Sequence, residues 1–181
     1  MPTRHMAVES VPQSIWSAGI YQSLKAAGVS QVTYVPDAGH KDLIQLCHAD
    51  PAMRTVSLTT EEEGVALLAG AWLGGARGVL LMQSSGVGNC VNMLSLIQEC
   101  RIPLLMVVTM RGEWGETNPW QVPMGQKTAA ALELSGVIVH EVNEVRKLED
   151  EVAAAAQLAF VSTRAVAVLI GQRLIGAKRF E

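Results

Sequence analysis

Residues 59–70 read Thr59-Thr60-Glu61-Glu62-Glu63-Gly64-Val65-Ala66-Leu67-Leu68-Ala69-Gly70, a helix start at which three carboxylates precede an apolar run. Thr60 and Glu63 have the spacing of a capping box, and acidic side chains near a helix N-terminus complement the helix dipole. On a helical wheel, however, Glu61 lies in line with the bulkiest apolar side chains and points inward. A buried carboxylate needs a partner, a proton or a ligand. The stretch is therefore either a structural helix start or the position of a functional glutamate.

Apolar or β-branched runs alternate with helical segments on both sides of this stretch. We expect strands at residues 32–35, 55–58, 78–82, 104–108, 136–140 and 165–170, and helices near 14–27, 41–49, 61–73, 88–98, 126–134 and 144–160. This alternation predicts a three-layer α/β/α fold with a six-stranded, mainly parallel sheet. The length of 181 residues suits a single domain over 1–181, with residues 1–10 as a loose tail.

Composition excludes several classes of function. A formal net charge of −3 provides no basic surface for nucleic acid. No run reaches the roughly 18 apolar residues of a membrane span, and the first residues do not resemble a signal peptide. No carboxylates and histidines have the spacing of a metal site. We expect a cytoplasmic protein.

In sheets of this kind, ligands bind at the carboxyl ends of the strands. The turn 83–89 carries glycines and could offer amides to an anion, or it could be a tight turn without a ligand. The long segment 109–125 contains Arg111 and is followed by Gln126 and Lys127. These three side chains could clasp an oxyanion, or they could be solvated. His40 lies just past the first strand, where it could donate a proton or contact an anion.

Four motifs, in this order, resemble a known family. They are Val35-Pro36-Asp37, then Thr60-Glu61-Glu62-Glu63-Gly64-Val65 with Ala69-Gly70-Ala71, then Met82-Gln83-Ser84-Ser85-Gly86-Val87-Gly88-Asn89, and last Arg111-Gly112-Glu113. Nearly the whole chain resembles the pyrimidine-binding (PYR) domain of thiamine diphosphate enzymes. The match is to the α subunits of two-chain decarboxylases, in the sulfopyruvate and phosphonopyruvate decarboxylase family.

The resemblance implies a role for individual residues. The family's catalytic glutamate precedes the Gly of an Ala-Gly pair by nine positions, which places it at Glu61 because Gly70 matches. Glu61 would then hydrogen-bond the aminopyrimidine of thiamine diphosphate. Further cofactor-binding positions would be Gln83, Ser85, Gly86, Gly88 and Asn89, and the substrate-binding candidates are His40, Arg111 and Lys127. Thr60 departs from the family, which often has His there, and no fixed family residue is expected at His40.

The resemblance also implies a partner. Family members hold the diphosphate and Mg²⁺ through a Gly-Asp-Gly segment, which these 181 residues do not contain. We therefore expect a β subunit that binds diphosphate and Mg²⁺, in an α2β2 assembly or a multiple of it. The expected reaction is decarboxylation of a small anionic 2-oxo acid, sulfopyruvate first and phosphonopyruvate second. The alternatives are a related carboligase and a non-catalytic α/β subunit that binds a nucleotide or regulates a partner.

Overall fold

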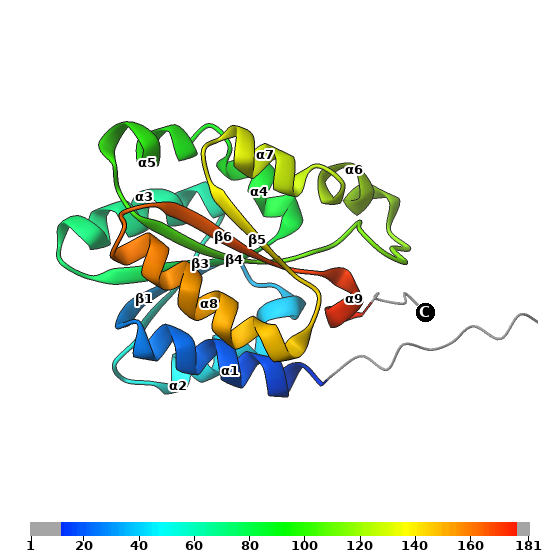
Figure 1. Cartoon of the computed structure of the whole chain (residues 1–181), viewed down its shortest axis with the longest axis horizontal. Coiled ribbons are helices and arrows are strands. Elements are labelled where there is room, and N and C mark those ends of the chain that lie inside the picture. The colour runs from blue at the N-terminus through cyan, green and yellow to red at the C-terminus, as the bar shows by residue number, and fades with distance from the viewer. Residues whose placement is uncertain (1–11, 177–181) are drawn as a thin grey trace, which may run out of the picture.

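One all-parallel sheet organises the computed structural model, which describes residues 12–176 (Figure 1). The strand order is β2-β1-β3-β4-β6-β5. The strands are β1 (Val29–Tyr34), β2 (Arg54–Ser57), β3 (Arg77–Gln83), β4 (Leu104–Thr109), β5 (Ile138–Val142) and β6 (Ala165–Ile170). The predicted six-stranded parallel sheet is confirmed. The predicted tail, residues 1–10, lies outside the described residues, and the assignment of 1–181 to a single domain stays a prediction.

Helices cover both faces of this sheet (Figure 1). One layer contains α1 (Gln13–Ala26), α2 (Lys41–Ala49) and α8 (Val145–Phe160). The other contains α3 (Glu61–Leu73), α4 (Ser84–Cys90), α5 (Leu94–Cys100) and α7 (Thr128–Leu134). Successive strand residues enter opposite cores, as Leu80 and Leu81 do, and each fully buried Leu contributes roughly 1.5–3 kcal/mol. Two-sided burial explains why the central strands are almost continuously apolar.

Short elements follow the carboxyl ends of three strands. They are the 3₁₀ helices η1 (Ala38–His40) and η2 (Pro119–Gln121), and the helices α6 (Val122–Gly125) and α9 (Gln172–Ile175). The end of the predicted loop 109–125 is therefore helical. Among residues 12–176, no helix has the length and apolar character that crossing a membrane requires.

The chain after β3 differs from the prediction. Residues 84–90 form helix α4 where a turn was predicted, and the helix predicted at 88–98 is two helices, α4 and α5. Gly86 gives the physical reason, because a Cβ there would lie 2.4 Å from Cδ of Glu61. This glycine lets a helix approach a neighbouring side chain, and sequence alone does not distinguish that use from a turn.

The start of β5 is also displaced from the prediction. Residues 136–137 form the turn that follows α7, because Gly136 has a φ of 73° and its N–H donates to the carbonyl of Glu133. Glycine is the residue that adopts this left-handed conformation at low cost. The strand therefore begins at Ile138, two residues later than predicted.

Candidate active site

Glu61 is the first residue of α3 and is only 8% exposed. Gly64, one turn later, brings the helix onto the sheet, since a Cβ there would lie 2.7 Å from Leu80 Cδ1 and 2.8 Å from Leu58 Cδ1. Val65 and Leu68 continue the buried row. The inward orientation predicted from the helical wheel is confirmed, and the carboxylate lies at the carboxyl end of the sheet.

The capping box predicted for Thr60 and Glu63 does not form. The Thr60 hydroxyl donates to the Glu62 carboxylate, and this hydrogen bond lowers the pKa of Glu62. The Glu63 carboxylate accepts from the backbone N–H of Thr59 at 2.9 Å. Glu62 and Glu63 thus bond the two residues that precede α3, whereas the buried Glu61 carboxylate bonds neither of them.

Helix α4 holds the Glu61 carboxylate from one side. Asn89 Nδ2 donates to Glu61 Oε2 at 2.8 Å, and Gly86 leaves the space that the carboxylate occupies. Oε1 of Glu61 takes no hydrogen bond from any residue of the described range 12–176. One oxygen is thus held by Asn89, while the other keeps its capacity to accept or share a proton.

An open groove of about 700 Å³ lies beside Asn89. Trp120 lines this groove, and the residue is 82% exposed. Its lining residues are Ser85, Asn89, Asn118, Pro119, Trp120, Pro123 and Met124. A Cβ on Gly88 would meet Met124 Sδ at 3.4 Å, so Gly88 faces α6. Of the predicted cofactor positions, Ser85, Gly86, Gly88 and Asn89 all lie on α4.

A second cavity, of about 270 Å³, lies at the carboxyl ends of β1, β3 and β4. Asp37 is its central acid, because its carboxylate accepts from Gln83 Nε2 at 3.2 Å and from Thr109 Oγ1 at 2.7 Å. Ser85 Oγ donates to Gln83 Oε1 at 3.1 Å and so connects this cavity to α4. Asp37 was not among the predicted site residues. Its signal was its place directly after the first strand, in Val35-Pro36-Asp37.

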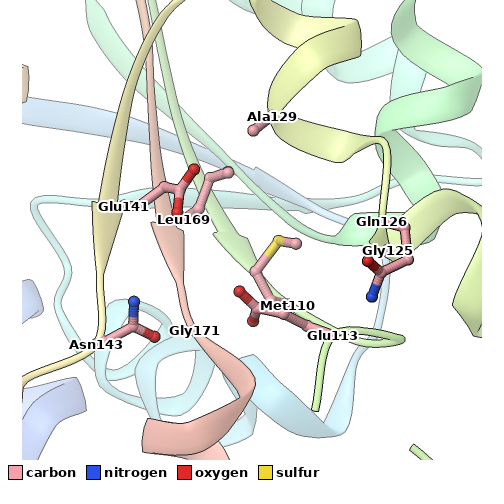
Figure 2. Close-up of a pocket in the computed structure, with 9 residues that line it drawn as sticks. All are labelled: Met110, Glu113, Gly125, Gln126, Ala129, Glu141, Asn143, Leu169 and Gly171. Carbon is pink, nitrogen blue, oxygen red and sulfur yellow. The ribbon is translucent and has the colours of Figure 1, made fainter.

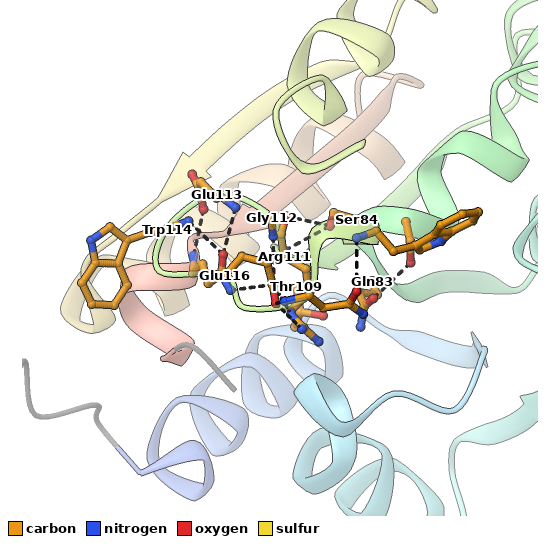
Figure 3. A network of polar contacts seen from close by, with 12 residues as sticks. Gln83, Ser84, Thr109, Arg111, Gly112, Glu113, Trp114 and Glu116 are labelled. Atoms are coloured by element: carbon orange, nitrogen blue, oxygen red, sulfur yellow. Dashed lines mark hydrogen bonds and ion pairs between the residues drawn. The ribbon is translucent and has the colours of Figure 1, made fainter. Parts of the chain in front are cut away.

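Arg111 also lines the 270 Å³ cavity and is 8% exposed. Its Nε and Nη2 donate to the two carboxylate oxygens of Glu116 at 2.6 and 2.7 Å (Figure 3). This pairing raises the pKa of Arg111 and lowers the pKa of Glu116. The guanidinium is therefore fixed along one edge, while Nη1 has no partner among residues 12–176.

The three side chains of the predicted oxyanion site, Arg111, Gln126 and Lys127, do not line one common cavity. Gln126 Nε2 donates to the carbonyl of Gly112 at 2.8 Å, and Lys127 is exposed at the start of α7. His40 is fully buried, with Nε2 at 3.2 Å from the Met82 carbonyl and 3.1 Å from the Val107 carbonyl. Burial lowers the pKa of His40, so the ring is a neutral part of the core. Of the three substrate-binding candidates, only Arg111 lines the cavity.

A smaller cavity, of about 150 Å³, lies near the ends of β5 and β6 (Figure 2). Glu141 of β5 and Glu113 of the loop after β4 both line it. Within residues 12–176, no Lys, Arg or His lines it, so the charge of this lining does not suit an anionic acid.

Two cysteines are enclosed in the cores, and neither is a nucleophile in this environment. Burial raises the pKa of Cys47 and of Cys90 to about 12 in each case. Both thiols are therefore protonated near neutral pH. Within residues 12–176, no three His, Cys, Asp or Glu side chains form a group that could hold a metal ion.

Residues 16–133 match the family model described as thiamine pyrophosphate enzyme, N-terminal TPP binding domain. Sulfopyruvate decarboxylase subunit alpha from Methanothermobacter thermautotrophicus is 34% identical over 155 residues, which are 85% of this chain and 94% of that protein. The protein of the same name from Methanococcus maripaludis is 39% identical over 118 residues, which are 65% of this chain and 71% of that protein. Phosphonopyruvate decarboxylase from Streptomyces viridochromogenes is 40% identical over 122 residues, 66% of this chain but 31% of its own length.

Among solved structures, 2-oxoglutarate:ferredoxin oxidoreductase from Magnetococcus marinus, with 2-oxoglutarate, coenzyme A and succinyl-CoA bound, matches with a TM-score of 0.71. The match covers 88% of this chain and 29% of that chain, at 17% identity. At that identity the likeness supports the fold alone.

Proposed function

The chain belongs to the thiamine pyrophosphate enzyme family, and we propose that it is the α subunit of a two-chain decarboxylase for a small anionic 2-oxo acid. The resemblance inferred from the four motifs is confirmed by the family match and by the relatives. Sulfopyruvate, which would give sulfoacetaldehyde and CO₂, is the first candidate substrate, because the relative matched over 94% of its length has that name. Phosphonopyruvate is the second.

The observation that carries the proposal is the Glu61 carboxylate, buried and held by Asn89 through Oε2 alone. When bound, thiamine diphosphate supplies the electron sink that lets CO₂ leave a 2-oxo acid. Glu61 Oε1 would share a proton with the pyrimidine ring nitrogen, and Gly86 leaves the room that the Glu61 carboxyl group itself occupies. A non-catalytic subunit would need no inward carboxylate at the start of α3, so the burial of Glu61 favours the enzyme.

The 270 Å³ cavity is the proposed substrate site. Gln83 and Thr109 orient Asp37 there, and Arg111 contributes the cation. Two carboxylates, those of Asp37 and Glu116, accompany one guanidinium, which gives a formal charge of −1. A dianionic acid would therefore need further positive charge from outside residues 12–176, and we propose that a partner chain supplies it.

The proposed partner is a β subunit that holds the diphosphate and Mg²⁺. Three observations support it: the relatives are named as alpha subunits, the 181 residues contain no Gly-Asp-Gly, and large apolar side chains are exposed. Leu73 at the end of α3 is 79% exposed, and Trp120 is 82% exposed. We propose an α2β2 assembly or a multiple of it, because a partner would bury these side chains. We also propose that this assembly lies in the cytoplasm.

Co-purification with the diphosphate-binding subunit of the same organism tests this function. The complex, with thiamine diphosphate and Mg²⁺, should release CO₂ from sulfopyruvate faster than from pyruvate, with phosphonopyruvate as the comparison. Release of CO₂ from none of the three acids would contradict the proposal. A ligated ketone in place of the aldehyde would show the carboligase instead.

A further inference from the structure

A polar network ties the loop after β4 to the start of α9 (Figure 3). Its centre is Glu116, whose side chain is 3% exposed. The carboxylate accepts both hydrogen bonds of Arg111, the backbone N–H groups of Gly112 at 3.1 Å and Asn118 at 3.0 Å, and the Gln172 amide at 3.0 Å. A carboxylate with this many donors fixes all of them relative to one another.

Gln172, the first residue of α9, is fully buried, and both the oxygen and the nitrogen of its amide form hydrogen bonds. Its Oε1 accepts from the backbone N–H groups of Glu113 and Trp114 at 2.9 Å each, while Nε2 donates to Glu116. Its own backbone N–H donates to Glu113 Oε2 at 2.8 Å. To bond all these groups, a side chain needs both an acceptor and a donor at its end. Glutamine has both, whereas a glutamate carboxylate has acceptors alone.

The network determines how Arg111 is presented. Glu116 takes Nε and Nη2, and the backbone N–H of Arg111 donates to Ser84 Oγ at 3.0 Å. Main chain and guanidinium are therefore both held, and Nη1 is the nitrogen without a partner among residues 12–176. A guanidinium fixed in this way recognises an anion with little loss of side-chain entropy.

We propose that Gln172 is a positioning residue for recognition of the substrate's anionic end. Through Glu116 it holds Arg111 at the cavity that Asp37, Gln83 and Thr109 also line, without touching the substrate itself. This inference rests on the proposed function, because it takes that cavity as the substrate site. It assigns a role to the segment that follows the last strand, which none of the sequence motifs reach.

Gln172→Glu is the sharpest test variant. It keeps the size and one acceptor oxygen, but it replaces the donor to Glu116 with a second carboxylate oxygen. The new carboxylate would face Glu116 where the amide now donates, with Glu113 nearby, and like charges repel each other. Gln157→Glu, on an exposed position of α8, is the matched control with the same change of charge.

The first readout uses the chain alone and needs no activity. Trypsin cleaves after Arg111 only when the loop leaves the network, because the Arg111 side chain is buried and bound. Gln172→Glu should be cleaved there about tenfold faster than the wild type or Gln157→Glu. Equal cleavage rates would show that Gln172 does not hold the loop.

The second readout is the KM of the reconstituted complex. Gln172→Glu should raise the KM for sulfopyruvate by about tenfold or more and the KM for pyruvate by less than about twofold. Faster cleavage without a selective rise in KM would overturn the positioning role. If the wild-type complex decarboxylates neither acid, the proposed function and this role both fail, while the trypsin result still decides whether Gln172 holds the loop.

Discussion

Asn89 Nδ2 donates a 2.8 Å hydrogen bond to Oε2 of Glu61, which joins the end of α4 to the start of α3. This hydrogen bond fixes the orientation of the carboxylate. Asn89→Ala should lower kcat of the complex by about tenfold or more, because the carboxylate then loses its orientation. Asn89→Asp places two carboxyl groups together, so the acidic limb of the kcat–pH profile should move to higher pH. An unchanged profile in Asn89→Asp would show that the two side chains do not interact during turnover.

Gly86 keeps open the space that Glu61 occupies. In Gly86→Ala, the new Cβ would lie 2.4 Å from Glu61 Cδ, so the flexible carboxyl end must move aside. We expect kcat to fall strongly while the free energy of unfolding in urea changes little, because better helix propensity offsets the crowding.

Gly70→Ala on α3 is the control for helix propensity, since no atom lies within 4 Å of its Cβ position. It should raise the free energy of unfolding of the isolated chain by about 0.5–1 kcal/mol. Wild-type kcat in Gly86→Ala would contradict the assigned position of the carboxylate.

His40 should make the folded state sensitive to acid. Burial lowers its pKa below the ordinary value of 6.5, so the unfolded chain takes up this proton first as the pH falls. The stability that depends on a neutral His40 is complete above about pH 6.5 and is lost as the pH falls below it. Urea unfolding between about pH 7.5 and 5.5 should show this loss in the wild type and less of it in His40→Gln. The same pH dependence in both proteins would show that His40 is not its source.

Arg111 should matter for both stability and substrate choice. Arg111→Ala leaves the Glu116 carboxylate buried without its counter-ion, which should lower the free energy of unfolding by about 3 kcal/mol. Arg111→Ala with Glu116→Gln should recover part of that loss. In the complex, Arg111→Ala should raise the KM for sulfopyruvate by a factor that corresponds to ~1.5–3 kcal/mol, and the KM for pyruvate much less.

Lys127 provides the control for Arg111, because its side chain is also cationic but is exposed and lines none of the described cavities. Lys127→Ala should leave the kinetics of both acids unchanged. If Arg111→Ala changes sulfopyruvate and pyruvate equally, this chain does not recognise the anionic end.

Periodic patterns allowed the layers and the inward Glu61 to be predicted, because strand and helix periods act locally along the chain. The start of α4 could not be predicted, since the reason for Gly86 is a side chain 25 residues earlier in the sequence. The partner of Arg111 could not be predicted from the sequence either. Glu116 is five residues away, yet only the folded loop shows that it takes the hydrogen bonds assigned to a substrate. Asp37 was missed because its two partners come from other strands.

The central claim is that Glu61 is the catalytic carboxylate of this subunit. In the reconstituted complex, Glu61→Gln should lower kcat for sulfopyruvate by at least ~100-fold, because an amide cannot share a proton with the pyrimidine ring as a carboxyl group can. Its circular dichroism and urea midpoint should stay close to those of the wild type. Glu62→Gln, the neighbouring acid that bonds Thr60, should keep kcat within a few-fold of the wild type. An active Glu61→Gln enzyme, or equal losses at the two positions, would contradict the account.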